Sequence, residues 1–259
     1  MPDGKSTKKI TRVQSESSQT QQPAETRPFV PSEESKGKAK SLRVYSIILW
    51  LLGIAAEAGA IYVLFQVPVN TVWLIALIIV DLVLVVIGSQ LWKKANRFSP
   101  ASEKDKTRFF IQNQLGTIIS IIAFLPLVIL IFTNKNMSGQ QKGIIGAIAA
   151  VALVIAGITS YDFNPPSVEQ YAQQIQEVES LTGNNFVYWT KSGTHYHIFK
   201  DCSYINRDQT TEIFEGTVQQ ARELKNITAL CSLCRSKVEK QKNVGTGETK
   251  VQEPSESPR

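Results

Sequence analysis

The chain is poor in the residues that bind metals and form disulfides, because it has only three cysteines and two histidines among 259 residues. All three cysteines belong to one pattern, in which His197-x4-Cys202 is followed by Cys231-x2-Cys234. No cysteine therefore remains for a disulfide outside this pattern. The chain also has four long apolar runs that lack Lys, Arg and His, so an acidic residue within them has no cation in any run to pair with.

Large apolar side chains are scarce near both ends of the chain. Residues 1–41 and 241–259 are rich in Ser, Gln, Glu, Lys and Pro. Segments of this composition bury too little surface to offset the conformational entropy that folding costs. We therefore expect disordered tails over both ranges. A cleaved secretory signal is not expected, because the first apolar run begins only after about forty polar residues.

Four apolar runs occupy the middle of the chain, over 44–66, 71–92, 109–133 and 143–160. A helix needs roughly 17 to 25 residues to cross the ~30 Å hydrocarbon core of a bilayer. We therefore predict an α-helical membrane bundle of four transmembrane helices over 42–160. The fourth run is short and rich in Gly and Ala, so a buried or re-entrant helix is its alternative. Its small residues at spacing four, such as Gly139, Gly143 and Ala147, or Gly146 and Ala150, suit close helix packing.

Lys and Arg are distributed unevenly around these runs. The segment before the first run and the connection between the second and third runs contain Lys36, Lys38, Lys40, Arg43, Lys93, Lys94, Arg97, Lys104, Lys106 and Arg108. The first-to-second connection has no charge, and the third-to-fourth has only Lys135 and Lys142. Because short loops with excess positive charge stay in the cytoplasm, we expect a multi-pass cell-membrane protein with both termini cytoplasmic. The C-terminal segment would face a reducing solution, in which disulfides are rare.

The net charge of +6 suggests nucleic acid as one partner class. The excess positive charge lies beside the apolar runs, however, where membrane topology and anionic headgroups already account for it. The lipid bilayer is therefore the expected partner, and nucleic acid is the weaker alternative.

Two acidic residues, Glu57 and Asp81, lie near the middle of the first and second runs. An acid at mid-helix costs roughly 2.5 to 3.5 kcal/mol on insertion scales, so both should face protein rather than lipid. Adjacent antiparallel helices place the two carboxyls at similar depth, and we expect at least one of them to be neutral. They form either a proton or cation site or a packed pair that hydrogen-bonds a neighbouring helix through Tyr62, Thr117 or Ser120.

Residues 161–183 form a connector to the cysteines. Pro165 and Pro166 end the fourth helix, and Ser167 has the spacing of a helix cap with Gln170. The following apolar residues recur at steps of three and four, namely Val168, Tyr171, Ile175 and Val178. Such a seam could dimerise, which would make the protein a homo-oligomer. With so few heptads we favour an amphipathic juxtamembrane helix that packs on the following domain or lies at the headgroup boundary.

Residues 184–240 are predicted to form a small α+β zinc-binding domain. A hairpin over 186–190 and 194–199 leads to His197 and Cys202, and a helix over 217–225 with Val218, Ala221 and Leu224 inward precedes the second cysteine pair. Three cysteines and one histidine complete a tetrahedron around zinc, which is typical of a structural site. His195 is the alternative to His197 as the fourth ligand, because both lie on one face of the same strand.

About fifty residues of this domain resemble the small Ada-like metal-binding module, which is appended to some bacterial nucleases and membrane proteins. The matching positions are Val187-Tyr188-Trp-Thr-Lys-Ser-Gly193, Tyr196-His197, Cys202, Ile205 and Cys231-Ser-Leu-Cys234. The resemblance implies a zinc ion held by His197, Cys202, Cys231 and Cys234, and the Tyr196-His197 order favours His197 over His195. The interval from Cys202 to Cys231 is longer than usual for these modules, and no family is evident for the four-helix part.

Two functions are compatible with these features. The first is a non-enzymatic anchoring, scaffolding or interaction role, in which the cytoplasmic zinc module binds another protein. The alternative is a small transporter or channel subunit that uses Glu57 and Asp81. Methyl transfer to a zinc-bound cysteine, which the Ada comparison raises, is not expected, because this chain has one fewer thiolate and no nuclease or DNA-reading domain.

Overall fold

A computed structural model describes residues 9–13 and 29–245 of the chain. The chain divides into two compact units. The bundle unit covers Pro28–Gln170, and the His/Cys unit combines Tyr171–Arg259 with the N-terminal Met1–Arg27. The boundary falls inside α5 (Val168–Thr182), so the first turn of this helix belongs to the bundle unit and the rest to the His/Cys unit.

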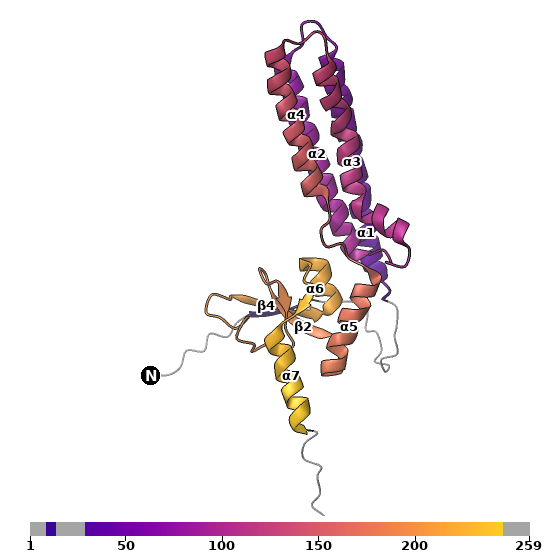
Figure 1. The fold of residues 1–259 in the computed structure, drawn as a ribbon. Coiled ribbons are helices and arrows are strands. Elements are labelled where there is room, and N and C mark those ends of the chain that lie inside the picture. The colour runs from indigo at the N-terminus through magenta and orange to yellow at the C-terminus, as the bar shows by residue number, and fades with distance from the viewer. Residues whose placement is uncertain (1–8, 14–28, 246–259) are drawn as a thin grey trace, which may run out of the picture. The chain divides into compact units, whose positions relative to one another are not determined.

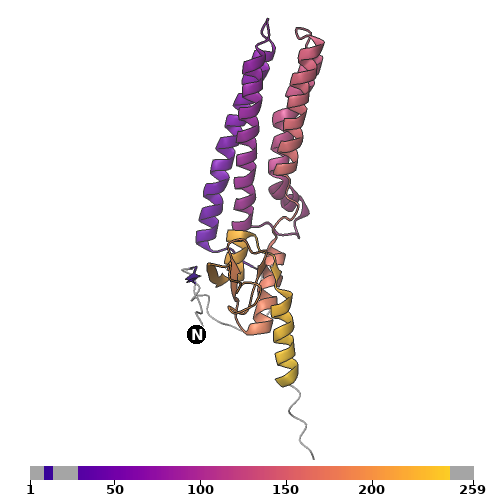
Figure 2. The same ribbon diagram turned by 90° about the vertical axis from the view of Figure 1, so that its left-hand side faces the viewer.

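The bundle unit consists of four long helices that run alongside one another (Figures 1 and 2), namely α1 (Glu33–Leu64), α2 (Thr71–Phe98), α3 (Lys106–Thr133) and α4 (Gly139–Ser160). All four are long and apolar enough to cross a membrane. This confirms the four predicted apolar helices. The fourth has 22 residues, which is enough for a full span, so its length does not require a re-entrant arrangement.

A polar side chain caps the start of each of these helices. Ser32, Asn70, Asp105 and Ser138 each accept a hydrogen bond from the backbone N–H three residues later. Such caps satisfy amides that have no partner inside the helix, so they determine where each helix begins.

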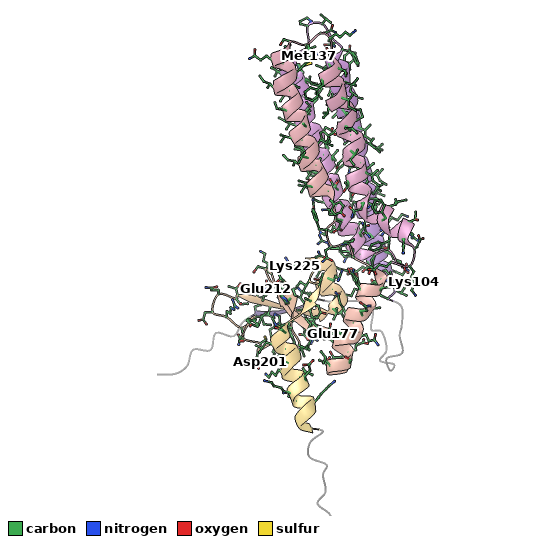
Figure 3. All side chains as sticks on the ribbon, in the orientation of Figure 1. Lys104, Met137, Glu177, Asp201, Glu212 and Lys225 are labelled. Atoms are coloured by element: carbon green, nitrogen blue, oxygen red, sulfur yellow. The ribbon has the colours of Figure 1, made fainter. Side chains whose placement is uncertain are left out.

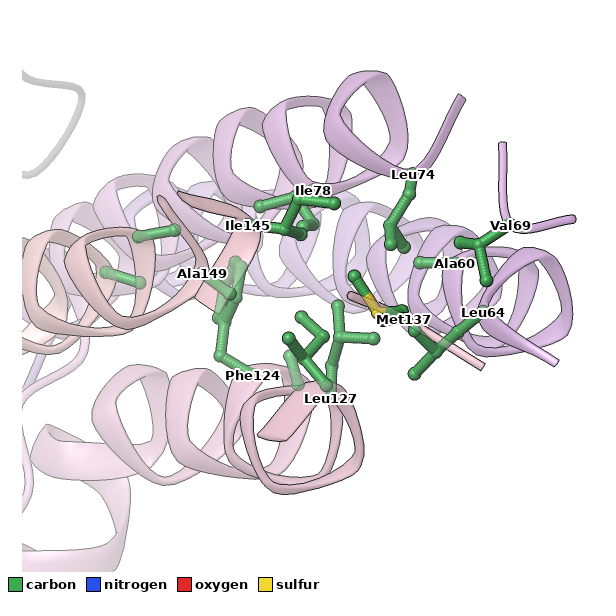
Figure 4. Packing of buried hydrophobic residues seen from close by; sticks show 14 of the residues in the cluster. Ala60, Leu64, Val69, Leu74, Ile78, Phe124, Leu127, Met137, Ile145 and Ala149 are labelled. Atoms are coloured by element: carbon green, nitrogen blue, oxygen red, sulfur yellow. The ribbon is translucent and has the colours of Figure 1, made fainter. Parts of the chain in front are cut away.

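The bundle core is made of fully buried aliphatic and aromatic side chains from several helices, such as Leu74, Ile78, Phe124 and Ile145 (Figure 4). Around this core, many large apolar side chains on the outer faces of the helices are exposed. An exposed apolar surface that surrounds a buried core is what a hydrocarbon environment requires.

The α1–α2 and α3–α4 connections lie at the same end of the bundle unit, because the Asn134 side chain donates a hydrogen bond to the Leu64 carbonyl at 2.8 Å. Met137 marks this end in Figure 3, and Lys104, in the α2–α3 connection, lies toward the opposite end. The connections therefore alternate between ends, as the charge pattern predicted. The Met137 end of the bundle unit has few charges, whereas the Lys104 end carries most of the Lys and Arg residues of this unit.

Close packing of small residues occurs at one of the two predicted places, at Gly146. A Cβ on Gly146 would lie 2.5 Å from the Phe132 ring, so α3 and α4 approach closely there. Nothing lies within 4 Å of a Cβ built on Gly139 or Gly143. The predicted role of these two glycines in helix packing is therefore wrong within this chain, because they lie on an open face.

The His/Cys unit has two small sheets. The first has the order β1-β4-β2, in which β4 (Glu212–Thr217) pairs antiparallel with β2 (Phe186–Thr190) and parallel with β1 (Lys9–Arg12). The second joins β3 (His195–Tyr196) to β5 (Ala229–Leu230) in parallel. Helices α5 (Val168–Thr182), α6 (Val218–Lys225) and α7 (Ser232–Gly245) complete the elements of the described residues, with α5 shared with the bundle unit.

The structure corrects the predicted tails within the described residues. The range 1–41 was expected to be disordered, yet it contains β1, and α1 begins within it at Glu33. β1 is ordered because its backbone pairs with the edge of β4, which compensates for its few apolar side chains. At the other end, α7 continues to Gly245, beyond the predicted start of a tail at 241. The rest of both predicted tails lies outside the described residues.

Two further details of the predicted domain differ. The strand expected over 194–199 is only two residues long, from His195 to Tyr196. The next residue, His197, forms a single bridge with Tyr188 of β2. Leu224 was expected to point inward but is 45% exposed, whereas Val218 and Ala221 are buried as predicted. Leu224 lies about 120° around the helix axis from Val218, so it is outside the buried face of α6.

Helix α5 packs on the His/Cys unit as expected for an amphipathic helix. Val178 is fully buried in the core of this unit, and Ile175 and Leu181 pack against the same core. The Ser167 hydroxyl accepts from the Gln170 N–H at 3.1 Å, and Gly183, with a φ of +78°, ends the helix. The predicted cap, buried face and terminator of the connector helix are thus confirmed.

Candidate metal centre

The first half of the metal site is built around His197. Two backbone hydrogen bonds of 2.7 Å join His197 to Tyr188 of β2, one in each direction. They hold the imidazole at the point where the chain leaves the sheet. Asp201, labelled in Figure 3, immediately precedes Cys202, whose carbonyl accepts from the amides of Ile205 and Asn206. This turn places the Cys202 side chain back toward the histidine.

The second half is the Cys231–Cys234 pair at the start of α7. The Cys231 N–H donates to the Tyr196 carbonyl at 2.9 Å, and the Cys231 carbonyl accepts from the Arg235 N–H at 3.0 Å. The first bond ties the pair to β3, and the second begins the helix. Two thiols separated by two residues at a helix start are therefore held beside the strand that leads to His197.

The four side chains converge on one point. The ligand atoms of His197, Cys202, Cys231 and Cys234 all lie within 4.8 Å of one another, and the four residues are buried. Cys234 Sγ lies 3.8 Å from His197 Nδ1. Two thiolates at about 2.3 Å from one tetrahedral zinc are about 3.8 Å apart, so the cluster has the dimensions of a four-coordinate site.

Because the cysteine side chains are buried, their charged thiolate forms need a nearby cation. Burial lowers the pKa of His197 to about 4, so the imidazole is neutral at pH 7 and has a free lone pair. Burial also raises the pKa of the Cys234 thiol to about 12, and the neighbouring Cys202 adds to this rise. The backbone amides of Ile198 and Phe199 act in the opposite direction, by hydrogen bonding to the Cys234 sulfur. A bound dication would stabilise the thiolates that burial alone disfavours.

The four donors thus fit a metal ion, and the structure decides between the two histidines. His195 is exposed, and its Nδ1 lies 3.0 Å from the hydroxyl of its neighbour Thr194. It does not belong to the cluster, so the fourth ligand position is occupied by His197. β3 ends at Tyr196, and His197 forms a separate bridge with Tyr188 before the chain bends at Ile198, so the two histidines have different surroundings.

The acidic pair of the bundle unit is buried as predicted. Glu57 of α1 is 6% exposed and Asp81 of α2 is 1% exposed. A Cβ on Gly53 would lie 2.8 Å from the Asp81 Oδ1 atom, so the Asp81 carboxyl lies directly against α1. The charges of Glu57 and Asp81 are close enough to interact. Both side chains therefore face protein.

The hydrogen-bond partners expected for these acids are engaged elsewhere. Tyr62 is 68% exposed, the Thr117 hydroxyl donates to Gln114, and the Ser120 hydroxyl donates to the Gly116 carbonyl. Among the described residues, neither carboxyl oxygen of Asp81 has a hydrogen-bond partner, and Glu57 Oε1 has none. Packing through Tyr62, Thr117 or Ser120 is therefore wrong as an explanation of the pair.

Comparison with known proteins adds no family to this description, since no family model, curated protein or solved structure matches the chain. The argument about function consequently depends on the two sites themselves. Sequence patterns identified all four candidate ligands, but not the amides of Ile198 and Phe199, because backbone donors have no signature in the side chains.

Proposed function

We propose that this protein is a membrane-embedded, non-enzymatic interaction protein that carries a structural zinc module on its cytoplasmic side. The observation that carries this proposal is the buried cluster of one imidazole and three thiols. Four protein donors complete a tetrahedron, so no position remains for a water or substrate, which is typical of structural rather than catalytic zinc. The resemblance of this segment to Ada-like modules, with His197 as the histidine ligand, agrees with the assignment of zinc.

The membrane assignment is supported by the four long apolar helices and their exposed apolar faces. The positive residues gather at the end of the bundle that holds the α2–α3 connection, and the uncharged α1–α2 connection lies at the other end. The positive-inside rule then assigns both chain termini to the cytoplasm. A reporter that is active only in the cytoplasm should be active when fused after residue 259 and inactive when inserted near Val69 or Met137.

The interaction role is tested by capture of binding partners with the full-length protein. Wild-type protein and the Cys231→Ser variant are purified from matched membranes, and their co-purifying proteins are compared by quantitative mass spectrometry. A partner that depends on the folded module should be retained by the wild type and by His195→Ala, which alters an exposed histidine, but lost from Cys231→Ser. Identical partner sets for wild type and Cys231→Ser would reject the interaction role of the module.

A second candidate function is ion or proton translocation by the bundle, and the carboxyl of Asp81, which has no hydrogen-bond partner within residues 9–13 and 29–245, favours it. A buried acid without a hydrogen bond is costly, and such residues in membranes often mark ion pathways. Asp81→Asn preserves the shape but cannot take up and release a proton. Loss of a wild-type proton or cation flux in proteoliposomes on this substitution, with the bundle still folded, would support this second candidate over the first.

A further inference from the structure

The bundle unit contains an open pocket of about 520 Å³ whose walls change from charged to apolar along its length. Arg43, Arg108 and Asp105 provide the charged part, and Ile111 and Leu115 provide an apolar wall. All of these residues belong to one unit, so the pocket does not depend on the position of the other. It lies at the bundle end that contains Lys104 (Figure 3).

The pocket lies at the boundary between polar and apolar surface. Exposed apolar side chains begin at Val44 on α1 and at Phe110 on α3, immediately after Arg43 and shortly after Arg108. Trp92, near the end of α2, lies at the same level, and indole rings favour the headgroup region of a bilayer. In a membrane, the two guanidinium groups would thus lie at headgroup depth and Ile111 and Leu115 at the start of the acyl chains.

Neighbouring groups hold Arg43 in place without neutralising it. Its Nη2 donates to the Ser99 carbonyl at 3.0 Å, and its guanidinium lies 5.5 Å from the centre of the Trp92 ring. Within residues 9–13 and 29–245, its Nε is buried without a hydrogen-bond partner. In the described part of the chain, the side-chain hydrogen bonds of Arg43 come from Nη2 alone, so Nη1 retains donor capacity for a ligand, whereas the buried Nε is shielded from one.

The second arginine increases the positive charge of the pocket. The charge of Arg108 is close enough to act against that of Arg43, and no ion pair with a carboxylate is present for either residue in the described part of the chain. Asp105 is the one acid of the pocket lining, and its side chain caps α3 by accepting from the Arg108 backbone N–H. Two guanidinium groups and one carboxylate leave a net positive charge, which an anion would balance.

We propose that this pocket binds the phosphate group of an anionic phospholipid through Arg43 and Arg108, with an acyl chain of the lipid along Ile111 and Leu115. Guanidinium groups suit phosphate because they donate two parallel hydrogen bonds. An apolar wall next to them suits an amphiphile better than a free ion. This site depends on the membrane assignment of the bundle, but not on zinc or on any protein partner of the His/Cys unit.

The test is native mass spectrometry of the full-length protein in detergent, titrated with phosphatidylglycerol or with phosphatidylcholine. We expect the wild type to retain phosphatidylglycerol in preference to phosphatidylcholine. Arg108→Gln should weaken phosphatidylglycerol binding by roughly tenfold, the effect of one charge-assisted hydrogen bond. The matched control is Lys94→Gln, which removes one exposed charge near the same end but outside the pocket, and it should bind as the wild type does.

The source of the phosphate is decided by two further measurements. Ile111→Ala should weaken lipid binding by a few fold, since it shortens the apolar wall. Millimolar inorganic phosphate should displace little bound lipid. Displacement of the lipid by inorganic phosphate, with no effect of Ile111→Ala, would overturn the lipid assignment.

Equal losses of phosphatidylglycerol binding in Arg108→Gln and Lys94→Gln, or no preference for phosphatidylglycerol, would overturn the site itself. Hydrogen exchange of each variant establishes that the bundle is folded.

Discussion

The two units bury their polar groups in opposite ways. In the His/Cys unit, the buried polar groups of the site converge on one point with the geometry of a metal site. In the bundle unit, the acids Glu57 and Asp81 are buried with three carboxyl oxygens that have no hydrogen-bond partner among the described residues. The first arrangement gains stability once a cation binds, whereas the second costs stability and is maintained by the surrounding helices. We therefore expect the units to respond differently to metal, acid and substitution.

Removal of the metal should have the largest effect and should separate the two units. The core of the His/Cys unit is small, and the metal ligands Cys202, Cys231 and Cys234 are part of it. Chelation of the full-length protein should therefore abolish hydrogen-exchange protection in β2, β4 and α6 while α1–α4 stay protected. Cys231→Ser should have the same effect, and His195→Ala should not. Protection that survives chelation in the His/Cys unit would show that its apolar core is sufficient.

Acid should also destabilise the His/Cys unit first. The pKa of His197 is lowered by burial from 6.5 to about 4, so between these values the unfolded chain binds more protons than the folded one. The stability of the metal-free unit should therefore fall as the pH decreases from about 6.5 toward 4. Acid should also release the metal, because protons compete with it for the thiolates. The denaturant midpoint of the unit, measured at several pH values with and without chelator, reports both effects. A midpoint independent of pH over this range would contradict the assignment.

Substitution of Gly53 by alanine tests the tight packing around Asp81. The new Cβ would lie 2.8 Å from Asp81 Oδ1 and 3.1 Å from Val85 Cγ2, so either the Asp81 carboxyl or the two helices must shift. We expect a loss of about 1–3 kcal/mol in bundle stability, as for other overpacked cores. Gly143→Ala is the matched control, because nothing lies within 4 Å of its Cβ, and it should be neutral or slightly stabilising. Thermal unfolding in detergent compares them, and equal stability of the two variants would argue against the close contact.

The smallest effect is expected at the edge of the His/Cys unit. Arg12 of β1 pairs with Glu215 of β4 at 3.0 Å, but the arginine side chain is mostly exposed. Arg12→Ala should therefore lower the stability of the unit by no more than about 1 kcal/mol. Faster amide exchange in Thr11 and Val13, without a change in the melting temperature of the unit, would match this expectation. A large drop in melting temperature would instead show that β1 is essential to the sheet.

Much of both sites was accessible from sequence because it depends on local patterns. The apolar runs predicted helices at 44–66 and the three following ranges, since runs of this length suit a membrane-spanning helix, whose backbone hydrogen bonds all lie within the segment. The cap Ser167 and the terminator Gly183 act within four residues of their own position. The C-x2-C spacing identified Cys231 and Cys234 for the same reason. These features need no information about distant parts of the chain.

The remaining features depend on segments that are far apart in the chain. β1 is ordered only because β4, about two hundred residues later, offers a free edge. The absence of hydrogen bonds to Asp81 could not be predicted either, since Tyr62 was as suitable a partner by sequence as any other residue. The exposure of Tyr62 is a consequence of how α1 is rotated in the bundle.

The sequence by itself thus determined the four apolar helices, the polar ends of the bundle and the cysteines of the candidate metal cluster, because hydrophobicity, charge and ligand chemistry are properties of the residues alone. Tertiary structure decided that His197 rather than His195 joins the cysteines, that Gly146 rather than Gly143 forms a helix contact, and that Arg43 and Arg108 share one pocket. These outcomes depend on helix rotation and on where a strand ends. Both are determined by packing between distant segments, so neither is encoded in a local pattern.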